Sequence, residues 1–100
     1  MDADLLDLAF TGDVFTWRGP APFYFVEVPA DLCEIIAAVS RMVTYGWGVI
    51  PVRVQIGGTD WTTSLFPKEG RYLVPLKDVV RKAERLDQGD EVSVRLIIRL

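Results

Sequence analysis

The chain has 100 residues, half of them hydrophobic and a quarter charged, so it is long enough and apolar enough to fold around one core. It contains no histidine and a single cysteine, Cys33. This excludes histidine-based catalysis, an intrachain disulfide and nearly every zinc or copper site. Carboxylate sites for magnesium or calcium stay open, but no acidic loop has the spacing of an EF-hand, and we expect neither a metal nor a cofactor.

The net charge of −3 is unevenly distributed along the chain. Residues 1–50 hold seven acids and two bases, whereas residues 51–100 hold seven acids and nine bases. An acidic protein is a poor general nucleic-acid binder, because phosphate neutralisation supplies most of that affinity. No apolar run approaches the roughly 20 residues that span a bilayer, and the N-terminus is acidic where a signal peptide would be basic. A cytoplasmic protein without membrane contact is expected.

The first half predicts three strands and a helix. Apolar residues alternate over residues 5–10, turn residues follow at 11–13, and 14–18 is β-prone, so the pattern predicts a hairpin. Residues 23–28 predict a further strand. Pro29 is typical of a helix start, and apolar residues then recur with helical spacing until glycines at 46 and 48 end the helix.

The second half repeats this order. Residues 49–56 alternate, Gly57-Gly58 predicts a tight hairpin turn, and residues 60–66 return. A short strand is expected at 71–74, followed by a helix that Pro75 opens and that runs to residue 86. Valines and other apolar residues alternate again from Val92 to the end of the chain.

The predicted order is ββ-β-α-β and then β-β-α-β, so the two halves share β-β-α-β, in approximate repeats 5–55 and 56–100 of one domain spanning residues 1–100. The fold class predicted is mixed β/α, mainly β. Helices near 30–44 and 75–86 could cap the two ends of a closed or split barrel, which would remove exposed sheet edges. A monomer would then suffice, although a weak homodimer stays open.

Several segments, in this order and spacing, carry a family resemblance: 51–58, 61–67, 72–77, 80–83 and 88–92. Together they resemble the uncharacterised bacterial family DUF1905, from about Phe10 to Ile98. The resemblance implies a double-split β-barrel, the architecture of AbrB-type DNA-binding regulators and MazE-type antitoxins. The family has no established reaction or catalytic residues, so the resemblance implies no site.

Four residues are candidates for a ligand site. Trp47 lies between two glycines with little local packing, and Trp61 opens a strand, so either indole could line a cleft. Arg53 and Arg81 could supply positive charge beside it. We expect a cleft lined by Trp47 or Trp61 with Arg53 or Arg81 nearby; the alternative is that the tryptophans are core residues.

Lys77, Arg81 and Arg85 are four residues apart and could form an anion-binding stripe on the second helix, or only a solvated helix face. No nucleophile has a base at a recognisable spacing, so an enzyme is the least favoured class. The sequence therefore favours a small non-catalytic binding or interaction module, for a small anionic ligand or a protein partner. The alternative is a nucleic-acid-binding domain by analogy to AbrB-type barrels.

Overall fold

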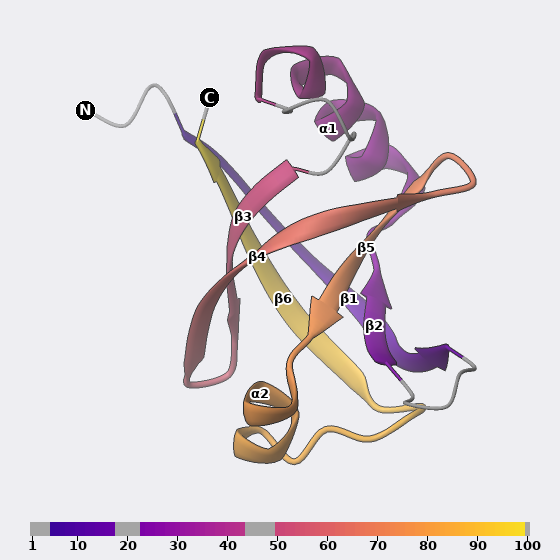
Figure 1. Cartoon of the computed structure of the whole chain (residues 1–100), viewed down its shortest axis with the longest axis vertical. Helices are drawn as coiled ribbons and strands as arrows, with labels where there is room; N and C mark the ends of the chain where they lie inside the picture. Colours follow the sequence, from indigo (N-terminus) through magenta and orange to yellow (C-terminus); the bar gives the residue numbers. More distant parts are fainter. Residues whose placement is uncertain (1–4, 18–22, 44–49, 100) are drawn as a thin grey trace.

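A computed structural model describes residues 5–17, 23–43 and 50–99 of the chain, apart from the side chains of Trp17 and of residues 40–43. These residues form six strands and two helices (Figure 1). In chain order they are β1 (Leu5–Trp17), β2 (Phe23–Glu27), α1 (Ala30–Val43), β3 (Ile50–Ile56), β4 (Thr59–Lys68), β5 (Arg71–Leu76), α2 (Asp78–Ala83) and β6 (Glu91–Arg99).

The strands close into a barrel with the order β1-β2-β5-β4-β3-β6, and every ladder is antiparallel. Two long strands, β1 and β4, each pair with different strands along different parts of their length. β1 pairs with β6 along residues 5–13 and with β2 along 14–17, while β4 pairs with β3 along 59–65 and with β5 along 66–68. The expectation of a mainly β domain that closes into a barrel and carries two helices is confirmed.

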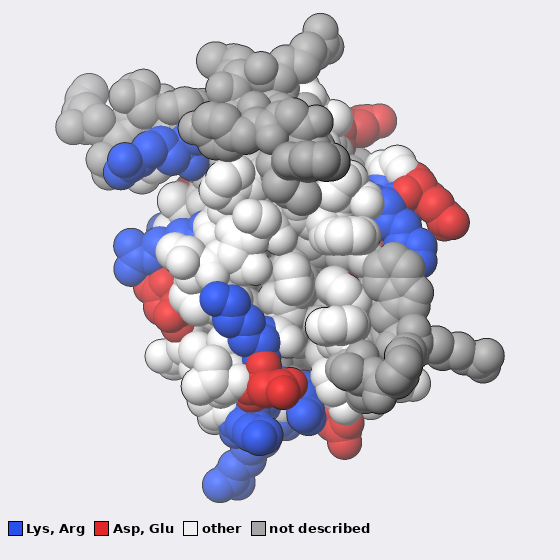
Figure 2. Space-filling model, in the orientation of Figure 1, with Lys and Arg blue, Asp and Glu red and all other residues white. Residues whose placement is uncertain are grey.

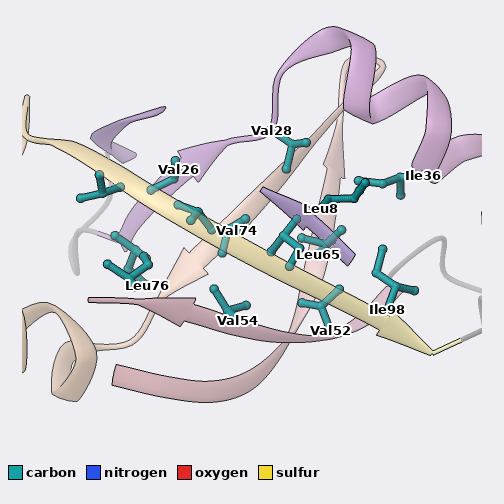
Figure 3. Close-up of a cluster of buried hydrophobic side chains, with 14 of the residues drawn as sticks. Leu8, Val26, Val28, Ile36, Val52, Val54, Leu65, Val74, Leu76 and Ile98 are labelled. Atoms are coloured by element: carbon teal, nitrogen blue, oxygen red, sulfur yellow. The ribbon is translucent and has the colours of Figure 1, made fainter. Parts of the chain in front are cut away.

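The barrel is filled by alternate side chains of its strands, most of them valine, leucine and isoleucine (Figure 3). Val52, Val54 and Ile56 of β3 are buried, whereas Arg53 between them is exposed. This period of two is the one the sequence shows, and it sets which face of each strand meets solvent. The described residues include no buried charged or polar side chain.

The predicted hairpin at residues 5–18 is wrong, because β1 is one continuous strand. Gly12, expected in the turn, lies where β1 passes from β6 to β2. A Cβ at Gly12 would stand 2.8 Å from Cγ1 of Val26, which is fully buried. Glycine is therefore needed here for close approach of two strands rather than for a reversal of the chain.

The hairpin at Gly57-Gly58 is confirmed. Ile56 pairs with Thr59 across it, and Gly57 adopts a φ of 58°, in the left-handed region that favours glycine. The carboxylate of Glu84, just after α2, lies over this turn and accepts a hydrogen bond of 2.5 Å from the Thr59 hydroxyl. The end of α2 is thereby tied to the β3–β4 turn.

The helices lie at opposite ends of the barrel (Figure 1). α1 begins directly after Pro29, as predicted, and buries Cys33 and Ile36 against the core. Its predicted apolar stripe is only partly covered, since Ile35 remains 43% exposed. Neither helix is long and apolar enough to cross a membrane in the part of the chain that the structure describes.

α2 is shorter than predicted and starts later. Pro75 does not open it but lies inside β5, opposite Phe25 of β2. The helix ends at Ala83, and Arg85 adopts a φ of 53°, so the three bases predicted as one helical stripe do not lie on a common helix: Lys77 precedes it and Arg85 follows it. A proline fits either a helix start or a strand whose N–H side is unpaired, and here the second alternative holds.

Candidate functional site

The barrel has an incomplete seam between β4 and β5. Their ladder covers only three residue pairs, from Phe66 opposite Leu73 to Lys68 opposite Arg71. Beyond these pairs the two strands diverge toward the end of the barrel that holds α2 (Figure 1). Pro75 lies in the divergent part of β5 and cannot donate to a ladder, which fits the absence of pairing there.

A groove of about 430 Å³ lies at this seam. Its walls come from the ends of β2 and β5, from the middle of β4 and from the start of α2. They are Phe23, Tyr24, Phe25, Thr63, Pro75, Leu76, Lys77 and Asp78. Ligand sites in proteins are typically concave, mostly apolar and supplied with a few polar groups, and this groove has that character.

A side-chain hydrogen bond crosses the unpaired part of the seam. The Lys77 ammonium donates to the carbonyl oxygen of Thr62 over 3.2 Å. A whole lysine side chain therefore spans a gap that a backbone hydrogen bond would close between paired strands. Because the Thr62 carbonyl points toward the seam, its N–H and those of alternate residues such as Ser64 point the same way.

The α2 end of the groove carries a second cation. The Arg81 guanidinium lies over the ring of Tyr24, 4.1 Å from its centroid, in cation–π geometry. Its Nη2 is 4.0 Å from an Asp78 oxygen, and its Nε is buried with no hydrogen-bond partner among the described residues. Lys77 and Arg81 thus place positive charge beside an apolar wall.

Aromatic side chains continue outward from the groove. Phe23 is 66% exposed and its ring lies 6.5 Å from that of Phe25, which in turn lies 5.9 Å from Phe15. Phe66 on β4 is 44% exposed. Figure 2 shows an area without charged side chains on one face of the molecule, with lysine, arginine and acidic side chains to its left, to its right and below it. Exposed aromatic side chains that border a groove are typical of interaction surfaces.

The outer face of the barrel over β1, β6, β3 and β4 carries polar side chains that pair with one another. Arg53 donates to both carboxylate oxygens of Asp60, with its Nη2 2.7 Å from Oδ2. Arg95 pairs with Asp7 in the same bidentate way and also donates to Gln55. The Arg53 and Gln55 hydrogen bonds lower the pKa of Asp60 from 3.8 to about 2, and Arg95 lowers the pKa of Asp7. These cations serve cross-strand pairing.

The family model for Domain of unknown function (DUF1905) matches residues 10–96. The chain belongs to this family. The match includes every residue that lines the seam groove, so the groove is part of the DUF1905 domain itself. No curated protein matches the chain.

The four residues predicted as a ligand site are placed differently in the DUF1905 barrel. Trp47 lies outside the described residues. Arg53 and Trp61 belong to opposite faces of the β3–β4 hairpin: Arg53 points to solvent opposite Thr62, while Trp61, opposite Val54, packs against the core. None of these three residues lines the seam groove, but Arg81 contacts its wall through Tyr24.

Phe23 and Thr63 of the groove were not predicted as site residues, whereas Lys77 was predicted only as part of an anion-binding stripe on the second helix. Phe23 belongs to β2 and Thr63 to β4, strands that only the barrel order brings together, and Lys77 directly precedes α2. One local signal was present, because Pro75 beside an apolar run is typical of a strand with an unpaired side as well as of a helix start. The described residues hold no group of three or more potential metal-binding side chains.

Proposed function

We propose that this DUF1905 domain is a small non-catalytic binding module and that its ligand site is the groove at the β4–β5 seam. One observation carries the proposal: the ladder stops after three pairs and leaves a 430 Å³ groove with apolar walls and a cation at its edge. Buried apolar contacts would supply affinity, and Lys77 with Arg81 would select a ligand that carries a negative group.

A non-catalytic role is supported by the state of Cys33. The thiol is buried and donates to the Val28 carbonyl over 3.3 Å, and burial raises its pKa. A thiol whose pKa is raised is a poor nucleophile, since the thiolate is the reactive form. Lys77 is exposed at the groove, where an ammonium group suits binding of an anion.

The double-split form of the barrel is part of the proposal. The order β1-β2-α1-β3 is followed by β4-β5-α2-β6, and exchanging β1 with β4, β2 with β5 and β3 with β6 leaves every neighbour relation of the barrel unchanged. This topology supports two interlocked β-β-α-β repeats within one chain. It also supports a monomer, because each strand has a neighbour on both sides over at least part of its length.

The same architecture by analogy suggests nucleic-acid binding, but the charges favour the first function. Arg53, Arg71 and Arg95 each form an ion pair with a carboxylate. Paired arginines contribute little to neutralising phosphates. Fluorescence polarisation with a labelled duplex at low salt separates the two: tight binding that weakens steeply with salt would favour the nucleic-acid function.

A thermal-shift and calorimetric screen with aromatic carboxylates, such as phenylpropionate and indole-3-acetate, tests the proposal. A probe present at about 100 times its Kd should stabilise the domain by about 2.7 kcal/mol. Phe23→Ala should weaken binding without unfolding the domain, because Phe23 is 66% exposed. Ile35→Ala, an exposed position on α1 at the other end of the barrel, is the matched control. Equal affinity of both variants, or no binding of any probe, would contradict the proposal.

A further inference from the structure

We infer that the ligand of the seam groove is an extended peptide segment that pairs with the free edge of β4 at Thr62 and Ser64. This inference rests on the proposed function and names the class of partner that the same site would take. It follows from the backbone of β4 rather than from the apolar walls alone. An extended segment with one aromatic side chain and a nearby acidic residue fits both the free backbone groups of β4 and the apolar walls of the groove.

The backbone groups of β4 at Thr62 and Ser64 point toward the seam. Thr62 lies opposite Arg53 in the β3 ladder, and its carbonyl points away from β3, since it accepts the Lys77 ammonium across the seam. In an antiparallel ladder the N–H and C=O of one residue point to the same side, and this side alternates along the strand. Thr62 and Ser64 therefore both present their backbone groups to the seam.

The described residues place no strand beside Thr62 and Ser64 on the seam side of β4. The β4–β5 ladder begins only at Phe66, so no described strand pairs with Thr62 or Ser64 on the seam side. Unpaired edge groups are the template on which an added strand forms, and peptide recognition by strand addition uses them for affinity. Lys77 takes one of these groups, the Thr62 carbonyl, and leaves the others available.

The groove would accommodate side chains of a peptide that lies along β4. A strand laid along β4 would point alternate residues to opposite sides, so one side chain could enter the groove beside Tyr24 and Pro75. The exposed Phe23 would contact it from the far wall. When the peptide pairs with Thr62, the displaced Lys77 ammonium becomes free for an acidic residue of the peptide. Charge complementarity therefore specifies a segment with a carboxylate near its apolar residue.

Calorimetry with a capped hexapeptide tests the inference. The probe alternates threonine and valine, carries one phenylalanine in place of a valine and ends in glutamate. Two isomers are compared, one N-methylated at the odd residues and one at the even residues, because only one set of N–H groups can face β4. Strand addition predicts that one isomer binds roughly tenfold or more weakly than the other, the loss expected for about one hydrogen bond.

The outcomes separate this inference from the proposed function. If both isomers bind as tightly as the parent peptide, and Phe23→Ala weakens all three, the groove binds ligands but strand addition is wrong. If the aromatic carboxylates bind and the parent peptide does not, the inference is again overturned while the binding function stands. If neither the peptide nor any aromatic carboxylate binds, both proposals fail.

Discussion

Lys77 and Thr62 are joined across the β4–β5 seam, where the ladder covers three residue pairs: the Lys77 ammonium donates to the Thr62 carbonyl over 3.2 Å. The hydrogen bond occupies an edge acceptor that a bound strand would need. Lys77 is therefore a competitor for Thr62 and, once displaced, a partner for an acidic ligand. These two roles can be separated by experiment.

Lys77→Met should have opposite effects on two peptides. It should weaken binding of the glutamate-containing probe, because the cation is lost. It should strengthen binding of the same peptide with glutamine in place of glutamate, because the Thr62 carbonyl is then free. Stability should change by no more than about 0.5 kcal/mol, as is usual for an exposed position. Affinities for both peptides by calorimetry check this, and parallel changes would show that Lys77 does not compete for the edge.

Gly12→Ala should destabilise the domain by about 1–3 kcal/mol, the usual effect of overpacking a filled core. The added methyl group would stand 2.8 Å from Cγ1 of Val26, which cannot move without disturbing the barrel interior. Urea denaturation measures the change. Gly58→Ala is the matched control, because nothing lies within 4 Å of its added methyl group, and its effect should stay within about 0.5 kcal/mol. Similar losses for both variants would contradict the account of β1.

The hydrogen bond between Thr59 and Glu84 should stabilise the docking of α2 on the β3–β4 turn. A double-mutant cycle with Thr59→Val and Glu84→Ala should give a coupling free energy of about 1 kcal/mol. The measurement is the free energy of unfolding of the two single variants and the double variant. A coupling near zero would mean that the 2.5 Å contact contributes nothing to stability.

The pairing of Arg53 with Asp60 should appear as acid-dependent stability. The pKa of Asp60 falls from 3.8 to about 2 in the folded state, so the unfolded state binds more protons between these values. The stabilisation is therefore fully present above about pH 4 and is lost as the pH falls toward about 2. Asp60→Asn should lower the melting temperature at neutral pH, and the difference from the wild type should shrink across this window. Arg53→Met should remove the same pH dependence, and a constant difference in both variants would contradict this explanation.

Cys33 should react with thiol reagents only when the domain opens. Its side chain is 4% exposed in relative area, its Sγ donates to the Val28 carbonyl, and burial raises its pKa. Reaction with a chromogenic disulfide should be slow in buffer and fast in denaturant, because the thiolate is the attacking species. Rapid labelling of the native domain would show that the packing of α1 on the barrel does not protect the Cys33 thiol.

Local patterns were enough to predict most strands and the inward face of each. In β3 and β6, buried valines, leucines and isoleucines alternate with exposed residues, and period-2 alternation needs no knowledge of the partner strand. The turn at Gly57-Gly58 was likewise predicted by its own two residues. Closure of the barrel followed from the need to leave few edges on a small sheet.

Features that depend on pairing between distant residues were not predictable in this way. Gly12 has the local signature of a turn, and only its closeness to Val26 shows that it permits β1 and β2 to approach closely. Pro75 is equally compatible with a helix start and a strand edge, and the stop of the β4–β5 ladder decides between them. The groove joins residues from β2, β4 and β5, so its position depends on the strand order rather than on any motif.

Residue-resolved NMR of the labelled domain during titration with the hexapeptide tests the central claim, binding at the β4–β5 seam, most directly. The amide signals of Thr62, Ser64, Leu76 and Lys77 should shift together along one binding isotherm, and the Thr62 and Ser64 amides should gain protection from hydrogen exchange. Signals of the paired polar face farther from the seam, such as Asp7 and Arg95, should change little. Shifts centred on that polar face, with Thr62 and Ser64 unchanged, would contradict the account.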